Sequence, residues 1–213
     1  MKNNAIILGD SYSTFEGFVP NGYAVWYPEN GRPETDVTEV SQTWWHQVIK
    51  EANLNLILNN SWSGSTIGYT GYNNSDCSKT SSFIYRLRWL IDNNFFVENK
   101  IDKVFVFGGT NDSWSDAPLD EAKYGEWQEE DLYSVLPAVC YLLNLLRETL
   151  PQADIYCLIN TEMKAPITFC MNQACEKYHI TPITFNRIDK RNGHPTIEGM
   201  KDIKDAVLKV LNI

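Results

Sequence analysis

The chain has 213 residues, of which 43% are hydrophobic and 21% are charged; this composition is typical of a globular protein and excludes a disordered chain. Its 18 basic and 27 acidic residues give a net charge of -9, which argues against nucleic acid as a partner, because binding a polyanion requires a basic face. This length is common for one α/β domain, so a single domain over residues 1–213 is expected.

The apolar runs of the sequence are short. None approaches the roughly 20 residues that cross a bilayer, so no membrane span is expected. The first residues, Met-Lys-Asn-Asn, lack the apolar segment of a secretory signal. The cytoplasm is therefore the expected location, unless a leader segment was removed and the protein is secreted.

Apolar segments rich in branched or aromatic residues alternate along the chain with segments of helical period. The continuous apolar segments suit strands that are buried on both faces, and they are residues 4–8, 54–58, 103–107, 154–159 and 180–184. The segments of helical period are residues 40–52, 82–93, 130–150, 166–178 and 197–211. This alternation predicts a five-stranded parallel sheet covered by helices on both faces, a three-layer α/β/α sandwich.

Three long loops each follow one of the first three predicted strands. They are residues 12–39, 61–79 and 110–128. Long loops in a compact domain are usually functional, and in parallel sheets the binding crevice lies at the carboxyl ends of the strands. We therefore look for the chemistry in the residues that directly follow these strands.

A serine stands at the end of the first predicted strand, in Gly9-Asp10-Ser11. A serine hydroxyl is a weak nucleophile unless a nearby base takes its proton, so this interpretation requires a histidine at the same edge. His194 is the best candidate, because it lies in the loop before the last predicted helix. His46 falls inside a predicted helix and His179 at the end of another, and both are expected to be structural or surface residues.

Acyl transfer also needs hydrogen-bond donors directed at the developing oxyanion. Gly64 follows the second strand and would let a backbone N–H approach the substrate closely. Asn111 follows the third strand and can present a side-chain amide. Each signal is weak by itself, because a glycine or asparagine after a strand usually makes a turn. Their common position at strand ends, in the order Ser, Gly, Asn, His, makes an esterase site the favoured interpretation.

The chain resembles the SGNH hydrolases, also called GDSL esterases and lipases, over nearly its whole length. The segments that carry this resemblance are Gly9-Asp10-Ser11, Ser63-Gly64, Gly109-Thr110-Asn111-Asp112 and His194-Pro195. The resemblance implies a flavodoxin-like fold and an acyl-enzyme formed on Ser11 with His194 as base. It also implies an oxyanion hole made by the N–H groups of Ser11 and Gly64 and the Asn111 amide. Tyr12 stands where the family name has leucine and is expected to pack below the serine.

One departure from the family pattern concerns the acid of the catalytic triad. The family has an aspartate three residues before the histidine, where this chain has Arg191, whereas Asp189 lies five residues before His194. Two alternatives follow: Asp189 completes a triad, or a backbone carbonyl holds the histidine of a Ser–His dyad and Asp189 only caps the turn. Asp10 and Asp112 are expected to accept hydrogen bonds from loop backbone.

Aromatic side chains crowd the three loops, and aromatic faces beside polar groups suit sugars. We expect Trp62 and Trp114 to contact the substrate, a small-molecule or carbohydrate ester, with carbohydrate O-acetyl groups preferred. No cofactor is required, and the cysteines, acids and histidines lack metal-ligand spacing, so no metal is expected. A catalytically weak carbohydrate-binding relative and a flavodoxin-like cofactor domain are the alternatives. The sequence does not indicate an oligomeric state.

Overall fold

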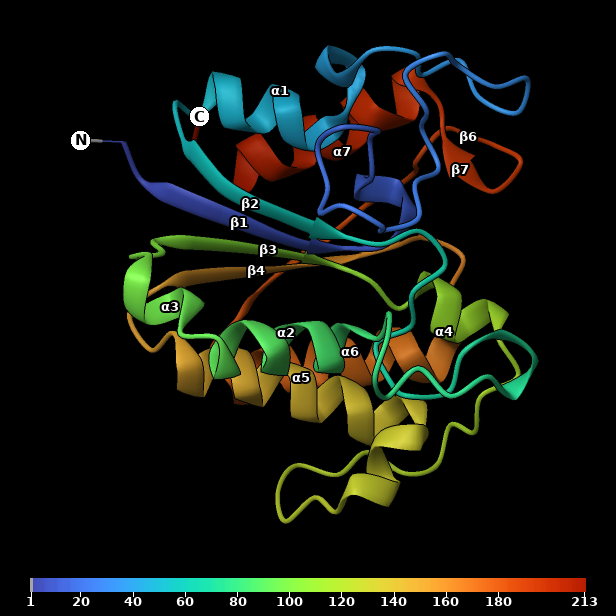
Figure 1. The fold of residues 1–213 in the computed structure, drawn as a ribbon, viewed down its shortest axis with the longest axis vertical. Coiled ribbons are helices and arrows are strands. Elements are labelled where there is room, and N and C mark those ends of the chain that lie inside the picture. The colour runs from blue at the N-terminus through green and yellow to red at the C-terminus, as the bar shows by residue number, and fades with distance from the viewer. Residues whose placement is uncertain (1) are drawn as a thin grey trace.

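A parallel five-stranded sheet lies at the centre of the computed structural model, which describes residues 2–213 (Figure 1). The strands are β1 (Asn4–Gly9), β2 (Asn55–Ser61), β3 (Lys103–Phe107), β4 (Asp154–Ile159) and β5 (Thr181–Thr184). Their order is β2-β1-β3-β4-β5, and each neighbouring pair is parallel. This is the strand order of flavodoxin-like folds.

Helices cover both faces of the sheet (Figure 1). One face carries α1 (Trp44–Glu51) and α7 (Ile197–Val210), and the other carries α2 (Phe83–Asp92), α5 (Val135–Thr149) and α6 (Ala165–Lys177). The short helices are α3 (Phe95–Glu98), α4 (Thr110–Trp114) and the 3₁₀ turns η1 (Ser11–Ser13), η2 (Val40–Gln42), η3 (Tyr72–Asn74) and η4 (Glu129–Tyr133). The predicted three-layer sandwich is confirmed. Among residues 2–213, no helix is long and apolar enough to cross a bilayer.

The sheet separates two hydrophobic clusters. Ile6 and Leu8 of β1 pack toward α2, α5 and α6, whereas Ala5 and Ile7 pack toward α1 and α7. Successive side chains of a strand point to opposite faces, so a central strand with helices on both sides must be apolar at every position. Burying one such aliphatic side chain contributes about 1.5–3 kcal/mol.

Several helices begin later than their sequence period predicts. The segment predicted as one helix over residues 40–52 divides at Thr43, whose hydroxyl accepts the backbone N–H of His46 and caps α1. The segment 130–150 also divides, into η4 and α5, although the Ser134 side chain makes no capping hydrogen bond there. Within the loop predicted over 110–128, Thr110–Trp114 forms the short helix α4 instead. Hydrophobic period does not detect such breaks, because capping and turn residues cause them.

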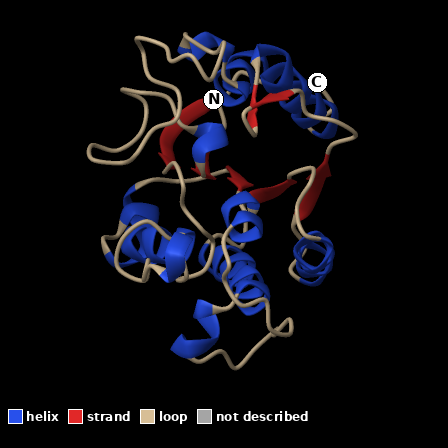
Figure 2. Ribbon diagram, turned by 90° about the vertical axis from the view of Figure 1, so that its right-hand side faces the viewer, coloured by secondary structure: helices blue, strands red, loops and turns tan. Residues whose placement is uncertain are grey.

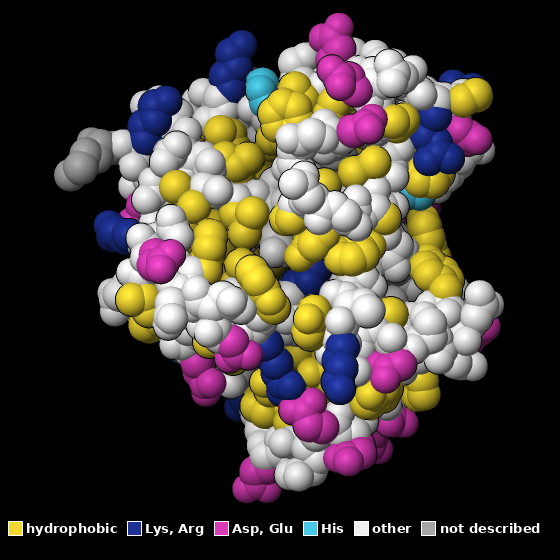
Figure 3. Space-filling view, in the orientation of Figure 1, with side chains coloured by type: hydrophobic (Ala, Val, Ile, Leu, Met, Phe, Trp, Pro, Cys, Tyr) yellow, Lys and Arg dark blue, Asp and Glu magenta, His cyan; other side chains and the backbone are white. Residues whose placement is uncertain are grey.

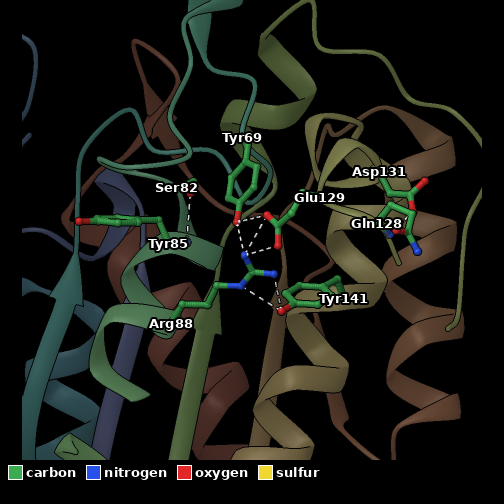
Figure 4. A network of polar contacts seen from close by, with 8 residues as sticks. All are labelled: Tyr69, Ser82, Tyr85, Arg88, Gln128, Glu129, Asp131 and Tyr141. Atoms are coloured by element: carbon green, nitrogen blue, oxygen red, sulfur yellow. Dashed lines mark hydrogen bonds and ion pairs between the residues drawn. The ribbon is translucent and has the colours of Figure 1, made fainter. Parts of the chain in front are cut away.

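The loops that follow the strands gather at one edge of the sheet, which Figure 2 views from the side toward which the strands point. The loop after β2 is tied to the helical layer through Arg88 of α2 (Figure 4). The Arg88 guanidinium donates to the hydroxyl of Tyr69 at 2.8 Å, to Glu129 at 2.7 Å and to the hydroxyl of Tyr141 at 2.7 Å. This network joins the loop to η4 and α5.

Candidate active site

The predicted nucleophile and base lie in hydrogen-bond contact, although 183 residues separate them in the sequence. Ser11 follows β1 and begins the η1 turn, which the Asp10 carboxylate caps by accepting the Tyr12 N–H at 3.0 Å. His194 Nε2 lies 2.9 Å from Ser11 Oγ. The two residues are only 3% and 7% exposed, so bulk water has little access to either reacting group.

A short hairpin carries His194. Its strands are β6 (Lys190–Arg191) and β7 (His194–Pro195), and the two residues between them both have left-handed backbone, with φ 50° at Asn192 and 75° at Gly193. Asn-Gly is the preferred pair for this two-residue turn. The turn brings the Asn192 carbonyl oxygen to 3.1 Å from His194 Nδ1. A backbone carbonyl therefore occupies the place at the imidazole that an aspartate takes in a triad.

The structure does not bring Asp189 to the imidazole, which corrects the triad alternative. In the hairpin, Asp189 lies opposite Thr196, whose N–H donates to the Asp189 carbonyl at 3.1 Å. The Thr196 hydroxyl donates to the Asp189 carboxylate at 2.5 Å and itself caps α7 by accepting the Gly199 N–H. Arg191 is the residue paired with His194 in the hairpin, so Asp189 lies two positions further along its strand. There its carboxylate contacts Thr196, the residue that caps α7.

The imidazole is packed between aromatic rings. The indole of Trp26 stacks on its face with ring centroids 3.5 Å apart and an angle of 7° between the planes. Trp114 meets the same ring edge-on, at 6.1 Å and 68°. Burial lowers the pKa of His194 to about 4, and the hydrogen bond to Asn192 opposes this shift only in part. The imidazole is therefore neutral at pH 7, the form that can accept a proton.

Strand register brings the predicted oxyanion donors to the same edge. Gly9 of the central strand β1 pairs with Ser61 on one side and Phe107 on the other, so the segments that follow all three strands leave together. Gly64 has φ 81° and open space where a side chain would stand, and within residues 2–213 its N–H has no acceptor. Asn111 is 3% exposed, and its amide nitrogen donates to the Ser65 carbonyl at 2.9 Å.

The amide of Asn111 is held in one orientation from both ends. Its nitrogen contacts the Ser65 carbonyl, and its oxygen accepts the Tyr72 hydroxyl at 2.8 Å. An amide nitrogen carries two N–H groups, so one remains for a ligand. Tyr72 was not singled out from the sequence for this role, and a tyrosine in an irregular loop carries no periodic signal that would have identified it.

Two buried acids hold the loop backbone, as the sequence predicts. The Asp112 carboxylate accepts the N–H of Ile67 at 2.9 Å and that of Gly68 at 3.3 Å, and Asp10 accepts the Tyr12 N–H. Burial raises the pKa of Asp10 to about 7 and that of Asp112 to about 6. Within residues 2–213, no three histidine, cysteine or acidic side chains lie close enough together to hold a metal ion.

A fully buried arginine, which the sequence reasoning missed, joins the end of β1 to the loop after β2. Arg86 of α2 donates to the Gly9 carbonyl at 3.2 Å and to the Ser65 hydroxyl at 3.1 Å. It also donates to the Asn60 side chain at 2.6 Å and to the Ser81 carbonyl at 2.8 Å. An arginine inside a helical period usually lies on the solvent face, so its sequence position offers no clue to this contact.

The two predicted substrate-binding tryptophans occupy different surroundings. Trp62 packs against Tyr23, with ring centroids 4.3 Å apart and the rings tilted by 37°, and lines a groove of about 640 Å³ along β2 and α2. Tyr85 and Trp89 line the same groove, and Figure 3 shows hydrophobic side chains gathered on this face. Trp114 is 45% exposed and lies beside the imidazole of His194.

The fold, and a serine and a histidine in contact beyond its first strand, are those expected of a serine hydrolase, and the family match establishes the class. The sequence profile of the GDSL-like lipase/acylhydrolase family matches residues 3–211. The chain belongs to this family, which confirms the resemblance to SGNH hydrolases. No curated protein sequence matches the chain.

Solved structures of similar proteins agree with the family assignment. A protein described as a GDSL-like lipase from Bacteroides ovatus is 42% identical, with a TM-score of 0.92 over 100% of this chain and 99% of that one. A second, from Bacteroides uniformis, is 42% identical, with a TM-score of 0.91 over 99% and 96% of the two chains. A family two carbohydrate esterase from Clostridium thermocellum, in complex with cellohexaose, shares the fold at 13% identity, with a TM-score of 0.66 over 100% of this chain and 64% of that one.

Proposed function

We propose that this hydrolase is a serine esterase of short-chain esters, with Ser11 as nucleophile and His194 as base. The observation that carries the proposal is the distance of 2.9 Å between Ser11 Oγ and His194 Nε2. A neutral imidazole whose Nδ1–H donates to the Asn192 carbonyl presents the lone pair of Nε2 to the hydroxyl. The serine proton therefore has an acceptor at the moment of attack.

The proposed reaction has two halves. Ser11 Oγ attacks the ester carbonyl while His194 takes its proton, and the tetrahedral oxyanion accepts hydrogen bonds from the N–H groups of Ser11 and Gly64 and the Asn111 amide. The imidazolium then gives its proton to the leaving alcohol, which leaves an acyl group on the serine. A water molecule, deprotonated by the same imidazole, releases the acid and restores the hydroxyl.

The alcohol portion of the natural ester is proposed to be a carbohydrate. The groove lined by Tyr23, Trp62 and Trp89 offers aromatic faces, one of them 51% exposed, and no carboxylate lines it. Trp62, which lines the groove, lies two residues before Gly64 in the chain. Carbohydrate esterases share the fold, and this likeness agrees with the proposal. Acetyl groups on such a carbohydrate are the preferred acyl portion.

The test compares the hydrolysis of p-nitrophenyl acetate and of an acetylated xylo-oligosaccharide. Ser11→Ala is expected to lower kcat for both esters by at least about a thousandfold, because the nucleophile is lost. The exposed Ser41→Ala variant serves as the matched control and should keep the wild-type rate. Equal rates for the Ser11→Ala variant and the wild type would refute the esterase.

The same assay separates the carbohydrate proposal from its alternatives. Trp62→Ala should raise KM for the acetylated oligosaccharide and leave KM for p-nitrophenyl acetate unchanged, because only the former reaches the groove. Equal effects on both substrates would refute a carbohydrate subsite. The alternative of a carbohydrate-binding relative with a weak active site predicts oligosaccharide binding together with equal hydrolysis rates for wild type and Ser11→Ala.

A further inference from the structure

Trp26, an aromatic side chain of the loop between β1 and α1, packs on the imidazole of His194. Trp26 stacks face to face on His194 at 3.5 Å between ring centroids. The Arg32 guanidinium lies over the same indole, 4.1 Å from its ring centroid. The three side chains therefore form a stack of guanidinium, indole and imidazole.

The backbone beside this stack is tied to both catalytic segments. The Trp26 N–H donates to the Thr14 hydroxyl at 2.9 Å, and that hydroxyl donates to the Ser11 carbonyl at 3.0 Å. On the other side, the Asn192 side-chain amide donates to the Glu34 carbonyl at 3.2 Å. The loop that carries Trp26 thus contacts the serine turn and the histidine hairpin together.

The Trp26 indole is held by contacts on its ring faces and not by a hydrogen bond from its N–H to any described residue. The Trp26 indole N–H is buried and has no acceptor among residues 2–213. Leaving a buried donor unpaired is unfavourable, so hydrogen bonding does not explain the ring position. Arg32 holds the outer face and is itself anchored to the Glu34 carboxylate at 3.0 Å.

We propose that Trp26, held by Arg32, is a positioning residue that keeps the His194 imidazole in line with Ser11, a task that the aspartate performs in a triad. This inference rests on the proposed esterase function. The carbonyl of Asn192 contacts only Nδ1 of the ring and selects the tautomer. This contact by itself does not prevent the imidazole plane from tilting. A face-to-face stack restrains this tilting, because turning the ring would push it into the indole.

The stack also shields the imidazole from water. The charged groups that act on the imidazole are Arg32, beyond the indole, and Lys190 of β6. The ring of Tyr12, a residue of η1, lies 5.5 Å from the His194 ring between centroids. Burial is the main cause that disfavours the imidazolium and lowers the pKa of His194, and both cations add to it. Removing the indole admits water to one face, so the pH at which activity is lost in acid should rise from about 4 toward 6.5.

The experiment measures kcat, KM and the pH profile of kcat/KM with p-nitrophenyl acetate for Trp26→Ala and Trp26→Phe. Trp26→Ala should lower kcat by about 10- to 100-fold with little change in KM, because a misplaced base slows proton transfer. Its acid limb should move to higher pH. Trp26→Phe should restore much of both properties, since phenylalanine keeps a smaller aromatic face and the indole N–H that it loses has no partner among residues 2–213.

Two further variants make the result decisive. Trp127→Ala removes another half-buried loop tryptophan, whose ring packs on Tyr141 and not on the imidazole, and should keep the wild-type kcat and acid limb. Arg32→Gln leaves the indole in place but removes its outer cation, and should move the acid limb upward with a smaller loss of kcat. It also tests the stack if Trp26→Ala fails to fold.

The failure of this inference differs from the failure of the proposed function. A Trp26→Ala enzyme with the wild-type kcat and acid limb, beside an inactive Ser11→Ala variant, overturns the role of Trp26 alone. Full activity in Ser11→Ala overturns the esterase itself. An NMR titration of the His194 ring in wild type and Trp26→Ala reports the shift without any assay of activity, and identical titration curves would overturn the shielding.

Discussion

At the scale of single residues, the candidate site places an uncharged histidine near backbone N–H donors. His194 is kept neutral by burial, and the N–H groups of Ser11 and Gly64 are the proposed donors to an oxyanion. An uncharged base beside such donors suits a reaction in which negative charge forms on the substrate and positive charge on the histidine. The prediction that belongs to this scale concerns the side-chain donor.

Asn111→Ala should lower kcat for p-nitrophenyl acetate by about a hundredfold or more, with a smaller change in KM, because the amide would act on the oxyanion and not on the bound ester. Tyr72→Phe should cause a smaller loss, since the amide keeps its contact with the Ser65 carbonyl. The half-buried Asn172 of α6 is the matched control, and Asn172→Ala should be fully active. An effect confined to KM would contradict the oxyanion role.

At the scale of elements, the β6–β7 hairpin decides which acceptor meets the histidine. Its two-residue turn places a carbonyl at the imidazole and leaves Asp189 paired with Thr196 at the start of α7. Sequence inspection left both acceptors open, although Asn-Gly between the two segments is a recognised hairpin signal. The signal was available but was not used, so the position of Asp189 was assigned only by the structure.

Asp189→Asn should therefore retain the wild-type kcat and the wild-type acid limb. An asparagine oxygen can still accept the Thr196 hydroxyl, so the start of α7 is preserved. The same replacement in a true triad costs about 10⁴-fold in kcat. Kinetic measurement over pH 4 to 8 distinguishes the two cases, and a large loss in a variant with an unchanged melting temperature would restore the triad.

At the scale of the whole molecule, the buried acids make stability depend on pH. Burial raises the pKa of Asp10 to about 7, whereas in the unfolded chain this carboxyl has its ordinary value near 3.8. Between these values the unfolded state releases the proton and the folded state keeps it. The stabilisation from the protonated carboxyl is thus fully present below about pH 4 and is lost as the pH rises through about 7.

Asp10→Asn should remove this dependence. The wild type is expected to lose more unfolding free energy between pH 5 and pH 8 than Asp10→Asn, which still accepts the Tyr12 N–H through its amide oxygen. Denaturant unfolding at both pH values measures the difference. Comparing the two proteins cancels the opposite slope from His194, whose pKa is lowered. Parallel pH curves would contradict a raised pKa for Asp10.

The sequence by itself determined the layers of the fold and the residues that follow its strands. Continuous apolar segments located β1 to β5 within a few residues of their observed bounds. Burial on both faces explains this pattern for the inner strands β1, β3 and β4, whereas the edge strand β5 buries only Ile183. Parallel strands end at one edge, so Ser11, Gly64 and Asn111 could be assigned to a common site. Both inferences depend on local pattern, which sequence records directly.

Only the tertiary structure decided which groups surround the histidine. The carbonyl of Asn192, the indole of Trp26 and the guanidinium of Arg32 reach the site through backbone conformation and ring stacking. Neither leaves a periodic trace, because a carbonyl belongs to every residue and a loop tryptophan can pack on any neighbour. The support of the base is a property of packing between segments far apart in the chain, and it therefore became visible only in three dimensions.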